Sequence, residues 1–457
     1  MAETPNSTPA KPPAAAPAAP KLLSLDDALT RLLAVARERV IPEIEKVATF
    51  DALGRVLAKP VVSGLDVPPA DNSSMDGYAM RAADVAQAGA VLPVSQRLPA
   101  GVVGSVLLPG TAARIFTGAP LPPGADAVVM QEHCEALPEG AGEATQPGLG
   151  QVRVLTAPQA GQWIRRRGED VQHGAEVLAA GCRLSPQALG LAAAVGASRL
   201  SVRRRPRVAL FSTGDELVMP GESLRPGAIY NSNRFMLRGL LQAAGCEVTD
   251  LGLVPDQLEA TRAALREAAL HNDLILSSGG VSVGEEDHVK PAVKAEGWLE
   301  AWALAIKPGK PLAFGAVRRE ATDGGGDGGE ALFMGLPGNP VSSFVTFLLA
   351  VAPVLRAIQG CGGGVGGVGG VGGALASGLP PAVMVRADFD WPSPDARREF
   401  LRARFNAHGG VELFPNQSSG VLTSAVWADG LVDNPSGQVV RRGDPVRLLL
   451  LSSLIGA

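Results

Sequence analysis

The spacing of apolar residues changes character several times along the chain. Residues 22–40, "LLSLDDALTRLLAVARERV", and 184–196, "LSPQALGLAAAVG", place apolar residues at helical spacing, and Ser24 is a candidate N-terminal cap. Between them, short Val-, Leu- and Ile-rich runs alternate with Gly/Pro turns, which predicts a small β-rich module. The pattern therefore predicts a helical and extended frame domain, 22–65 plus 156–203, that carries the β-rich module 66–155 as an insertion.

Strand and helix patterns alternate from residue 204 to residue 358. The predicted strands include "RVALFST", "DLILSS", "PLAFGAV" and "ALFMGL", and the predicted helices include "NRFMLRGLLQAAG" and "DQLEATRAALREAALHN". This rhythm predicts a doubly wound, mostly parallel sheet. The Gly-rich stretch 359–378 is predicted to be a linker, and 379–457 alternates as short strands with turns, typical of a small β-barrel-like domain or a sandwich. We expect a multi-domain α/β protein.

Composition narrows the class of protein. The net charge of −4 over 457 residues gives no bulk basic field, so no nucleic-acid partner is expected. The four cysteines form no CxxC pair, which is typical of a reducing cytosol. Residues 1–21 are Pro-rich without the apolar core of a signal peptide and are predicted to be a disordered tail. The apolar run 341–359 contains Pro353 and Arg356, so we predict a buried helix, a cytoplasmic protein and no membrane partner.

Three of the predicted strands end in loops of small and polar residues. Ligands of open α/β sheets bind beyond the carboxyl ends of the strands, and such loops bring N–H groups close to an anion. Each loop alone is compatible with an ordinary strand-to-helix turn, but three on one sheet favour an anionic, nucleotide-like ligand. The loops are "FSTGDEL" (211–217), "SSGGVSVGEED" (277–287) and "GLPGNPVSSF" (335–344). The second supplies the candidate phosphate-binding residues Ser278, Gly279, Gly280 and Ser282.

Charged side chains flank these loops. Glu216 and Asp287 are candidate ligands of Mg²⁺, which takes one or two carboxylates together with substrate phosphates. Asp256 begins a predicted helix, where it could equally be a helix cap, whereas for Asp287 a metal ligand is favoured over the alternative of a solvated acid in a first helical turn. In "AIKPGKP", Lys307 and Lys310 stand on either side of Pro-Gly. This turn suits a small oxyanion, or else it is a surface hairpin with solvated lysines.

Taken together, the motifs strongly resemble the molybdopterin molybdenumtransferase family, which includes bacterial MoeA and the E domain of gephyrin. The resemblance covers 22–358 almost continuously, and 379–457 more loosely, whereas the Gly tract departs from it. The matching stretches are "LDVPPADNSSMDGYAMR", "IFTGAPLPPGADAVVMQE", "IRRRGEDV", "RVALFSTGDEL", "IYNSNRFML", "SSGGVSVGEEDHVK", "AIKPGKPLAFG", "GLPGNPVSSF", "REFLRARF" and "PNQSSGVLTSA".

The resemblance implies an enzyme that takes adenylylated molybdopterin and molybdate, cleaves the phosphoanhydride with Mg²⁺, and yields molybdenum cofactor and AMP. It also implies a homodimer whose site lies between the α/β domain of one subunit and the β module of the other. Transient contact with the molybdopterin adenylyltransferase and with molybdoenzyme apoproteins is a further expectation. The positions carried over as catalytic are Asp76, Thr117, Asp170, Glu216, Asp256, Asp287 and Lys307. Those carried over to the molybdate pocket are Lys310, Pro311, Ser342, Arg402 and Ser419.

Two other functions compete with this interpretation. A molybdopterin adenylyltransferase shares the "SSGGVSVG" type of loop, but the frame and the β module ahead of that domain count against it. A scaffold protein is the second alternative, because gephyrin's version of the domain also binds receptor peptides. The acidic and lysine loops favour catalysis. One departure affects the molybdate contacts, since Ala303 stands where some relatives have a lysine.

Overall fold

The computed structural model describes residues 22–138, 149–281, 288–319, 328–361 and 379–456. These residues form two compact units, and each is described by itself: Ile44–Arg203 is one, and 22–43 with 204–456 is the other. The predicted tail 1–21 and most of the predicted linker 359–378 lie outside the described residues. The finer domain boundaries inside each unit stay predictions.

The larger unit is built on a sheet with the strand order β16-β13-β17-β21-β20-β18. The first four strands are parallel, and the last two pair antiparallel. The predicted mostly parallel sheet is therefore confirmed. The strands are β13 (Arg207–Ser212), β16 (Glu247–Leu253), β17 (Leu274–Ser278), β18 (Gly297–Ala303), β20 (Pro311–Arg318) and β21 (Glu330–Leu336).

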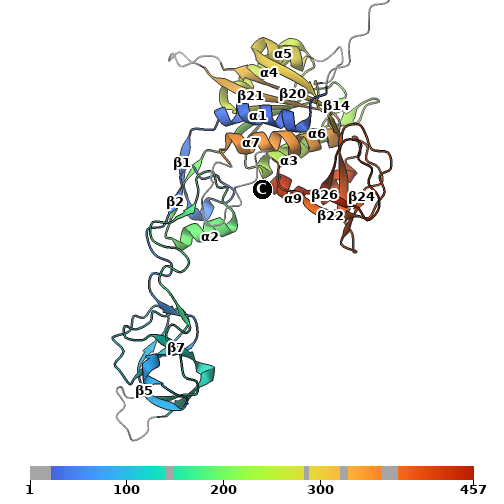
Figure 1. Ribbon diagram of the computed structural model, residues 1–457. Helices are drawn as coiled ribbons and strands as arrows, with labels where there is room; N and C mark the ends of the chain where they lie inside the picture. The colour runs from blue at the N-terminus through green and yellow to red at the C-terminus, as the bar shows by residue number, and fades with distance from the viewer. Residues whose placement is uncertain (1–21, 139–148, 282–287, 320–327, 362–378, 457) are drawn as a thin grey trace, which may run out of the picture. The chain divides into compact units, whose positions relative to one another are not determined.

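Helices cover both faces of this sheet because side chains along a strand alternate between its faces. Val208 and Leu210 of β13 belong to the apolar core shared with α1, α3 and α7, whereas Ala209 and Phe211 belong to the core shared with α4 and α5. Figure 1 shows the two helical layers on opposite sides of the sheet. The helices are α1 (Leu25–Glu38), α3 (Ser232–Ala243), α4 (Leu258–His271), α5 (Val289–Glu296) and α7 (Ala352–Ile358).

Helix α1 belongs to this unit. Its N-cap is Ser24, whose side chain accepts a hydrogen bond from Asp27 N at 3.0 Å, as the sequence predicts. Its apolar face, including Leu29 and Leu32, is buried in the core that α7 also joins. This placement differs from the assignment of 22–65 to the frame domain, because an amphipathic helix goes where its apolar face is covered.

The apolar run near residue 350 forms a continuous helix, Pro340–Ile358. It consists of α6 (Pro340–Thr346), the π-helical turn η4 (Phe347–Val351) and α7. Its length and composition would suffice to cross a membrane, but its apolar window is entirely buried inside the protein. The predicted buried helix is thus confirmed, and Asn339 with Pro340 marks its start.

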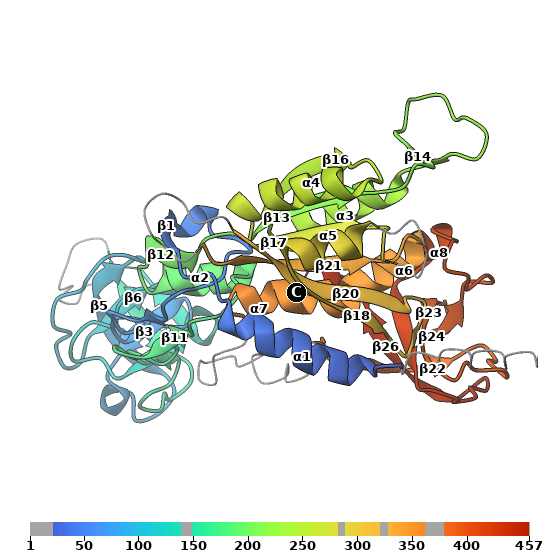
Figure 2. The same cartoon turned by 90° about the horizontal axis from the view of Figure 1, so that it is seen from above.

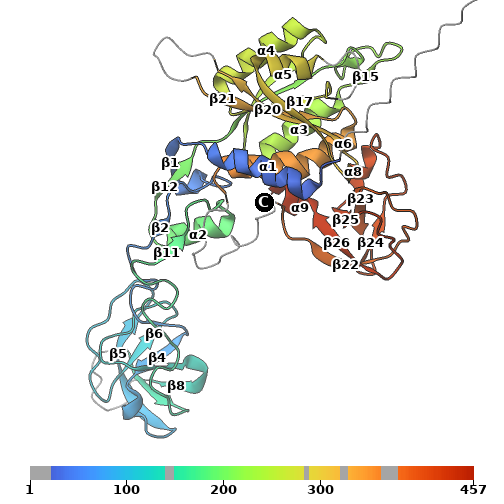
Figure 3. The ribbon, with the colours of Figure 1, turned by 45° about the horizontal axis from the view of Figure 1, so that its top comes forward.

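The C-terminal part of the same unit is a closed barrel. The strands follow the order β23-β24-β22-β26-β25, and β25 pairs back to β23 (Figure 3). The predicted barrel-like domain is confirmed. Strand β19 (Ile306–Lys307) joins the barrel by pairing parallel to β23. The remaining elements are β14 (Leu217–Val218), β15 (Ile229–Tyr230), β22 (Val383–Ala387), β23 (Arg398–Phe405), β24 (Gly410–Leu413), α8 (Thr423–Trp427), β25 (Gly430–Asn434), β26 (Pro445–Leu450) and α9 (Leu451–Gly456).

The smaller unit, Ile44–Arg203, contains a β module and a frame. The module is a sheet in the order β7-β4-β6-β5-β9-β8: β4 (Gly77–Met80), β5 (Ala90–Leu98), β6 (Ala112–Ile115), β7 (Ala127–Met130), β8 (Cys134–Leu137) and β9 (Gln151–Val154). The frame consists of antiparallel pairs and one described α-helix. Its elements are β1 (Ile44–Ala48) with β12 (Arg199–Arg203), β2 (Val61–Val62) with β11 (Glu176–Leu178), β3 (Asn72–Ser73) with β10 (Ile164–Arg165), and α2 (Pro186–Ala194).

Candidate functional site

The three loops singled out in the sequence lie side by side. Strands β13, β17 and β21 are neighbours in the sheet, and their last residues, Ser212, Ser278 and Leu336, are in register. Because the strands are parallel, the loops that follow them emerge at one edge. Figure 2 shows α6, which follows the third loop, beside the barrel strand β23. The Val341 N–H donates to Ser419 O at 3.0 Å, so the start of α6 is tied to a barrel loop.

A cavity of about 710 Å³ opens where these loops meet the barrel. Residues from the three loops, from the Lys307–Lys310 turn and from a barrel loop line it. Nine of the predicted site residues are among them: Glu216, Asp256, Gly279, Gly280, Lys307, Lys310, Pro311, Ser342 and Ser419. Ser282 and Asp287 lie outside the described residues. The cavity is also lined by Thr213, Gly214, Val281, Pro308, Gly309, Pro337, Gly338, Asn339, Arg397, Gln417 and Ser418.

The glycines of the second loop are held by protein contacts. Gly279 has a φ of 91°, and its N–H donates to Leu336 O at 3.1 Å, so this N–H continues the sheet. A Cβ on Gly279 would lie 2.8 Å from Thr213 O. Gly280 has a φ of 65°, and a Cβ there would lie 2.4 Å from Val289 Cγ2. Backbone conformation and close packing therefore require glycine at both positions.

Ser278 takes part in a buried hydrogen-bond network that connects two of the loops. Its side chain is buried, and its hydroxyl oxygen accepts a hydrogen bond from Asn233 Nδ2 at 2.8 Å. Asn233 Nδ2 also donates to Gly338 O at 2.7 Å, so this side chain from α3 joins the second loop to the third. Ser278 was predicted to contact phosphate, but it does not line the cavity. The stretch "IYNSNRFML" contains Asn233, but nothing local in it indicates this link.

The cationic side of the cavity is organised by two carboxylates of the barrel. Lys307 Nζ lies 3.3 Å from Asp395 Oδ2 and 3.3 Å from Glu399 Oε1. Arg397 Nε and Nη2 both donate to Asp395, at 2.9 Å each. Glu399 is fully buried and also accepts a hydrogen bond from Trp391 Nε1 at 2.7 Å. Sequence reasoning missed these partners, because the Lys307 turn and the barrel are about 90 residues apart in the chain.

Arg402 lies beneath the barrel loop and does not line the cavity. Only 1% of the residue is exposed, and its guanidinium donates to Ser424 Oγ at 3.1 Å and to Phe400 O at 3.1 Å. Its backbone N–H donates to Gln417 Oε1 at 2.9 Å, which steadies the loop that carries Ser419. Burial lowers the pKa of Arg402 to about 10. Arg397 is the arginine that reaches the cavity.

The acidic side of the cavity comes from Glu216 and Asp256, on the loops that follow β13 and β16. A Cβ on Gly214 would lie 2.6 Å from Glu216 Oε2, so this carboxylate lies directly over the glycine. No group of three or more His, Cys, Asp or Glu side chains able to hold a metal occurs among the described residues. Two carboxylates still fit Mg²⁺, because Mg²⁺ commonly takes one or two carboxylates and completes its shell with substrate phosphates and water.

Asp76, Thr117 and Asp170 lie in the smaller unit. Asp76 Oδ1 accepts hydrogen bonds from Thr117 N at 2.8 Å and Thr117 Oγ1 at 2.7 Å, and these bonds lower the pKa of the Asp76 carboxyl. The structure therefore brings Asp76 and Thr117 into contact. Asp170 is exposed, and it closely follows the three consecutive arginines 165–167 in the chain. Among these arginines, Arg166 Nη1 donates to Asp71 Oδ2 at 2.7 Å, so the arginine stretch is paired in part with an aspartate near Asp76 in the chain.

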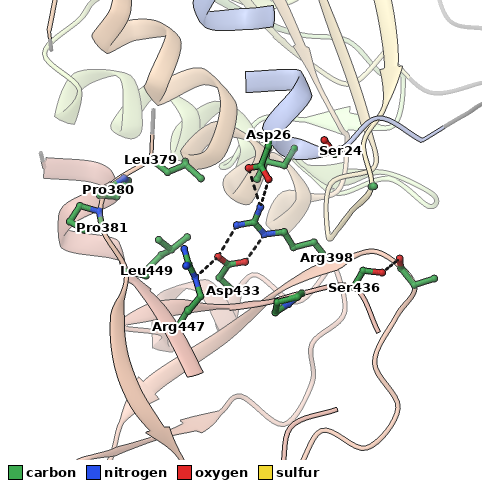
Figure 4. Close-up of a pocket in the computed structure, with 15 residues that line it drawn as sticks. Ser24, Asp26, Leu379, Pro380, Pro381, Arg398, Asp433, Ser436, Arg447 and Leu449 are labelled. Carbon is green, nitrogen blue, oxygen red and sulfur yellow. Dashed lines mark hydrogen bonds and ion pairs between the residues drawn. The ribbon is translucent and has the colours of Figure 1, made fainter. Parts of the chain in front are cut away.

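A second cavity, of about 700 Å³, lies between the start of α1 and the barrel. Figure 4 shows its charged side chains. Arg398 bridges Asp26 and Asp433, and Arg447 Nε lies 3.3 Å from Asp433 Oδ2. These charges are paired among themselves, and none of the predicted site residues lines this cavity. We therefore take the first cavity as the candidate site.

Family comparisons agree with this architecture. Residues 23–196 match the MoeA N-terminal region (domain I and II), 209–357 match a probable molybdopterin binding domain, and 384–451 match the MoeA C-terminal region (domain IV). The fold is thus that of a MoeA-type protein whose α/β domain matches a probable molybdopterin binding domain. The chain belongs to the molybdopterin molybdenumtransferase family, whose members are enzymes of molybdenum cofactor biosynthesis.

Individual relatives extend along most of the chain. A molybdopterin molybdenumtransferase of Haemophilus influenzae is 40% identical over 73% of this chain and 77% of its own length. The enzyme of the same name from Nostoc is 35% identical over 90% of this chain and 89% of its own. A molybdopterin biosynthesis MoeA protein of Pyrococcus horikoshii superposes with a TM-score of 0.71 at 30% identity, covering 94% of this chain and 100% of the other.

Proposed function

We propose that this transferase takes adenylylated molybdopterin and molybdate as substrates and releases AMP in a Mg²⁺-dependent step. The observation that carries the proposal is the cavity itself, which has two carboxylates near the glycine loops and three cationic side chains on the other side. The two carboxylates suit a metal ion that binds a phosphoanhydride, and the three cationic side chains suit a separate small oxyanion. Attack of water on the phosphoanhydride bond would free AMP and leave the terminal phosphate on molybdopterin, and the two dithiolene sulfurs would bind molybdenum as one molybdate oxygen leaves as water.

The residues divide the work by their position. Gly214 and Gly280 line the cavity at the strand ends, where we assign the phosphates, and Glu216 and Asp256 line it beside them. Lys307, Lys310, Pro311, Ser342 and Ser419 line the region that we assign to molybdate, with Arg397 as an additional cation. Mg²⁺, when bound, would neutralise phosphate charge and so favour departure of AMP. Asp287, predicted as a second metal ligand, retains that role as part of the proposal.

We infer further that the enzyme works as a cytoplasmic homodimer. The residues carried over as catalytic fall in two units of the chain, with Asp76, Thr117 and Asp170 in one and the cavity in the other. A site completed between two copies accounts for both sets. We also propose transient contact with the adenylyltransferase that would supply the substrate and with the apoproteins that would accept the product.

The full-length protein should be incubated with adenylylated molybdopterin, molybdate and Mg²⁺, and the release of AMP measured. We expect release that requires all three additions and stops when EDTA is present. A chain that makes the adenylate from ATP and molybdopterin would be an adenylyltransferase. A chain that does neither would be a scaffold, and either result would contradict the proposal.

A further inference from the structure

Arg397 lines the cavity, but the two N–H donors of its guanidinium that best bind an oxyanion are already hydrogen-bonded to the protein. A guanidinium binds an oxyanion most strongly through two parallel N–H donors. Nε and Nη2 of Arg397 form that pair, and both donate to Asp395, the residue two positions earlier. The Arg397 N–H also donates to Asp395 Oδ1 at 3.0 Å. These contacts hold the pKa of the Asp395 carboxyl well below its usual range, with the Arg397 side chain as the main cause.

Asp395 also forms an ion pair with Lys307, another cation that lines the cavity. Its Oδ2 lies 3.3 Å from Lys307 Nζ. Asp395 itself does not line the cavity, so it holds Lys307 and Arg397 from behind or beside it. The negative charge that an entering oxyanion would bring to these two cations is therefore already supplied by the Asp395 carboxylate.

Asp395 and Glu399 differ in how firmly they are held. The Glu399 side chain is 0% exposed and lies on strand β23, where Trp391 Nε1 donates to it. The Asp395 side chain is 22% exposed and lies in the irregular segment before β23. A side-chain rotation can release Asp395, whereas Glu399 cannot leave without opening the barrel. Glu399 therefore keeps Lys307 in place when Asp395 moves.

We propose that Asp395 is an internal competitor of the oxyanion substrate: it holds Arg397 and Lys307 before the substrate binds, and an entering tetrahedral dianion displaces it from them. This inference rests on the proposed function, which assigns molybdate to the same cations. The competition sets how tightly the site holds an oxyanion. It also orients the two cations before the substrate arrives.

Equilibrium binding of molybdate to the full-length protein tests the inference, with sulfate as a second tetrahedral dianion. We expect Asp395→Asn to bind both anions about fivefold more tightly than wild type, the upper range for loss of a competing exposed ion pair. Asp395→Ser, which lacks the amide as well, should bind more tightly too. Melting temperatures would show that both variants are folded.

Glu412→Gln is the matched control. It removes one carboxylate from the same barrel, where Glu412 pairs with Arg404 at 2.9 Å on an exposed surface. Its affinity for molybdate should equal that of wild type, which separates the local contact from overall charge. Unchanged or weaker binding by both folded Asp395 variants would overturn the inference and show that Asp395 orients the cations for the substrate. Wild type that binds no molybdate would overturn the proposed function and this inference with it.

Discussion

Gly280 has two constraints that involve no ligand. Its φ of 65° favours glycine, and a Cβ would lie 2.4 Å from Val289 Cγ2 and 3.0 Å from Thr213 Oγ1. Val289 begins α5 and is fully buried, so it has no room to yield. The glycine that the sequence predicts as a phosphate contact is thus also the point where the loop packs onto a helix.

Gly280→Ala should therefore lower the free energy of unfolding by about 1–3 kcal/mol, the usual cost of overpacking. Chemical denaturation would measure it. Gly239→Ala is the control, because Gly239 lies within α3 with no atom within 4 Å of an added Cβ. That change should be neutral or stabilising by up to about 1 kcal/mol. Equal stability of Gly280→Ala and wild type would show that Val289 moves aside readily.

Lys307→Ala should separate the two substrates. The change removes an ammonium that lines the cavity and is held by Glu399, at some distance along the chain from the glycine loops. We expect adenylylated molybdopterin to bind with nearly wild-type affinity, while molybdate-dependent release of AMP falls about 100-fold, as for loss of a hydrogen bond to a charged group. Direct binding of the adenylate and an AMP assay would measure both. Loss of adenylate binding would place Lys307 against the phosphates instead.

At the scale of elements, ion pairs fasten helices to one another beside the sheet. Glu296, the last residue of α5, accepts hydrogen bonds from Arg262 Nε at 2.7 Å and Arg266 Nη1 at 2.8 Å, both on α4. Burial opposes the charged form of Glu296, but the two arginines outweigh it and lower the pKa of its carboxyl. This junction holds together the helical layer that packs on β13 and β17.

The lowered pKa predicts the direction of pH dependence. Since the folded state has the lower pKa, Glu296 contributes stability above its ordinary value of 4.5, and that contribution is lost as the pH falls through the folded value. Glu296→Gln should therefore cost about 0.5–1 kcal/mol at pH 7 and almost nothing in strong acid. Melting temperatures between pH 7 and pH 3 would show it. The exposed Glu267→Gln on α4 should change little at any pH, and an equal effect of both variants would argue against the junction.

At the scale of the whole molecule, the residues assigned to catalysis fall in two units. Asp76 and Thr117 form one hydrogen-bonded pair, and the cavity with Lys307 lies in the other unit. A homodimer that shares its sites between subunits has a distinctive behaviour when variants are mixed, because a mixed dimer contains one site with both sets of residues intact.

Asp76→Asn and Lys307→Ala proteins should each release almost no AMP alone. After subunit exchange, about half of the dimers are mixed and each has one intact site of two, so about a quarter of wild-type activity should return. The AMP assay on the mixture measures this recovery, and mixing two batches of the same variant is the control. Failure to recover, with exchange demonstrated by differently tagged subunits, would mean that each chain completes its own site.

Local patterns determined much of this protein. The cap at Ser24, the strand–helix alternation and the glycine loops all depend on residues close together in the chain, and the structure has them where the sequence predicts them. The convergence of the three loops also followed from the sequence, because parallel strands place their carboxyl ends at one edge. The sequence therefore predicts that the three glycine-containing loops and the Lys307–Lys310 turn belong to one site.

Only the tertiary structure decided which side chains reach the cavity. Arg397 and Arg402 are both arginines of one short stretch, but Arg402 follows Phe400 in the alternation of β23 and is buried, whereas Arg397 precedes the strand and lines the cavity. Both faces of β23 are buried from Glu399 to Ala403, so strand alternation alone does not decide which arginine reaches the cavity, and the packing of the barrel around the strand does. The pairing of Lys307 with Asp395, and the placement of α1 beside α7, join segments far apart in the chain, and such contacts form only when a shared core brings the segments together.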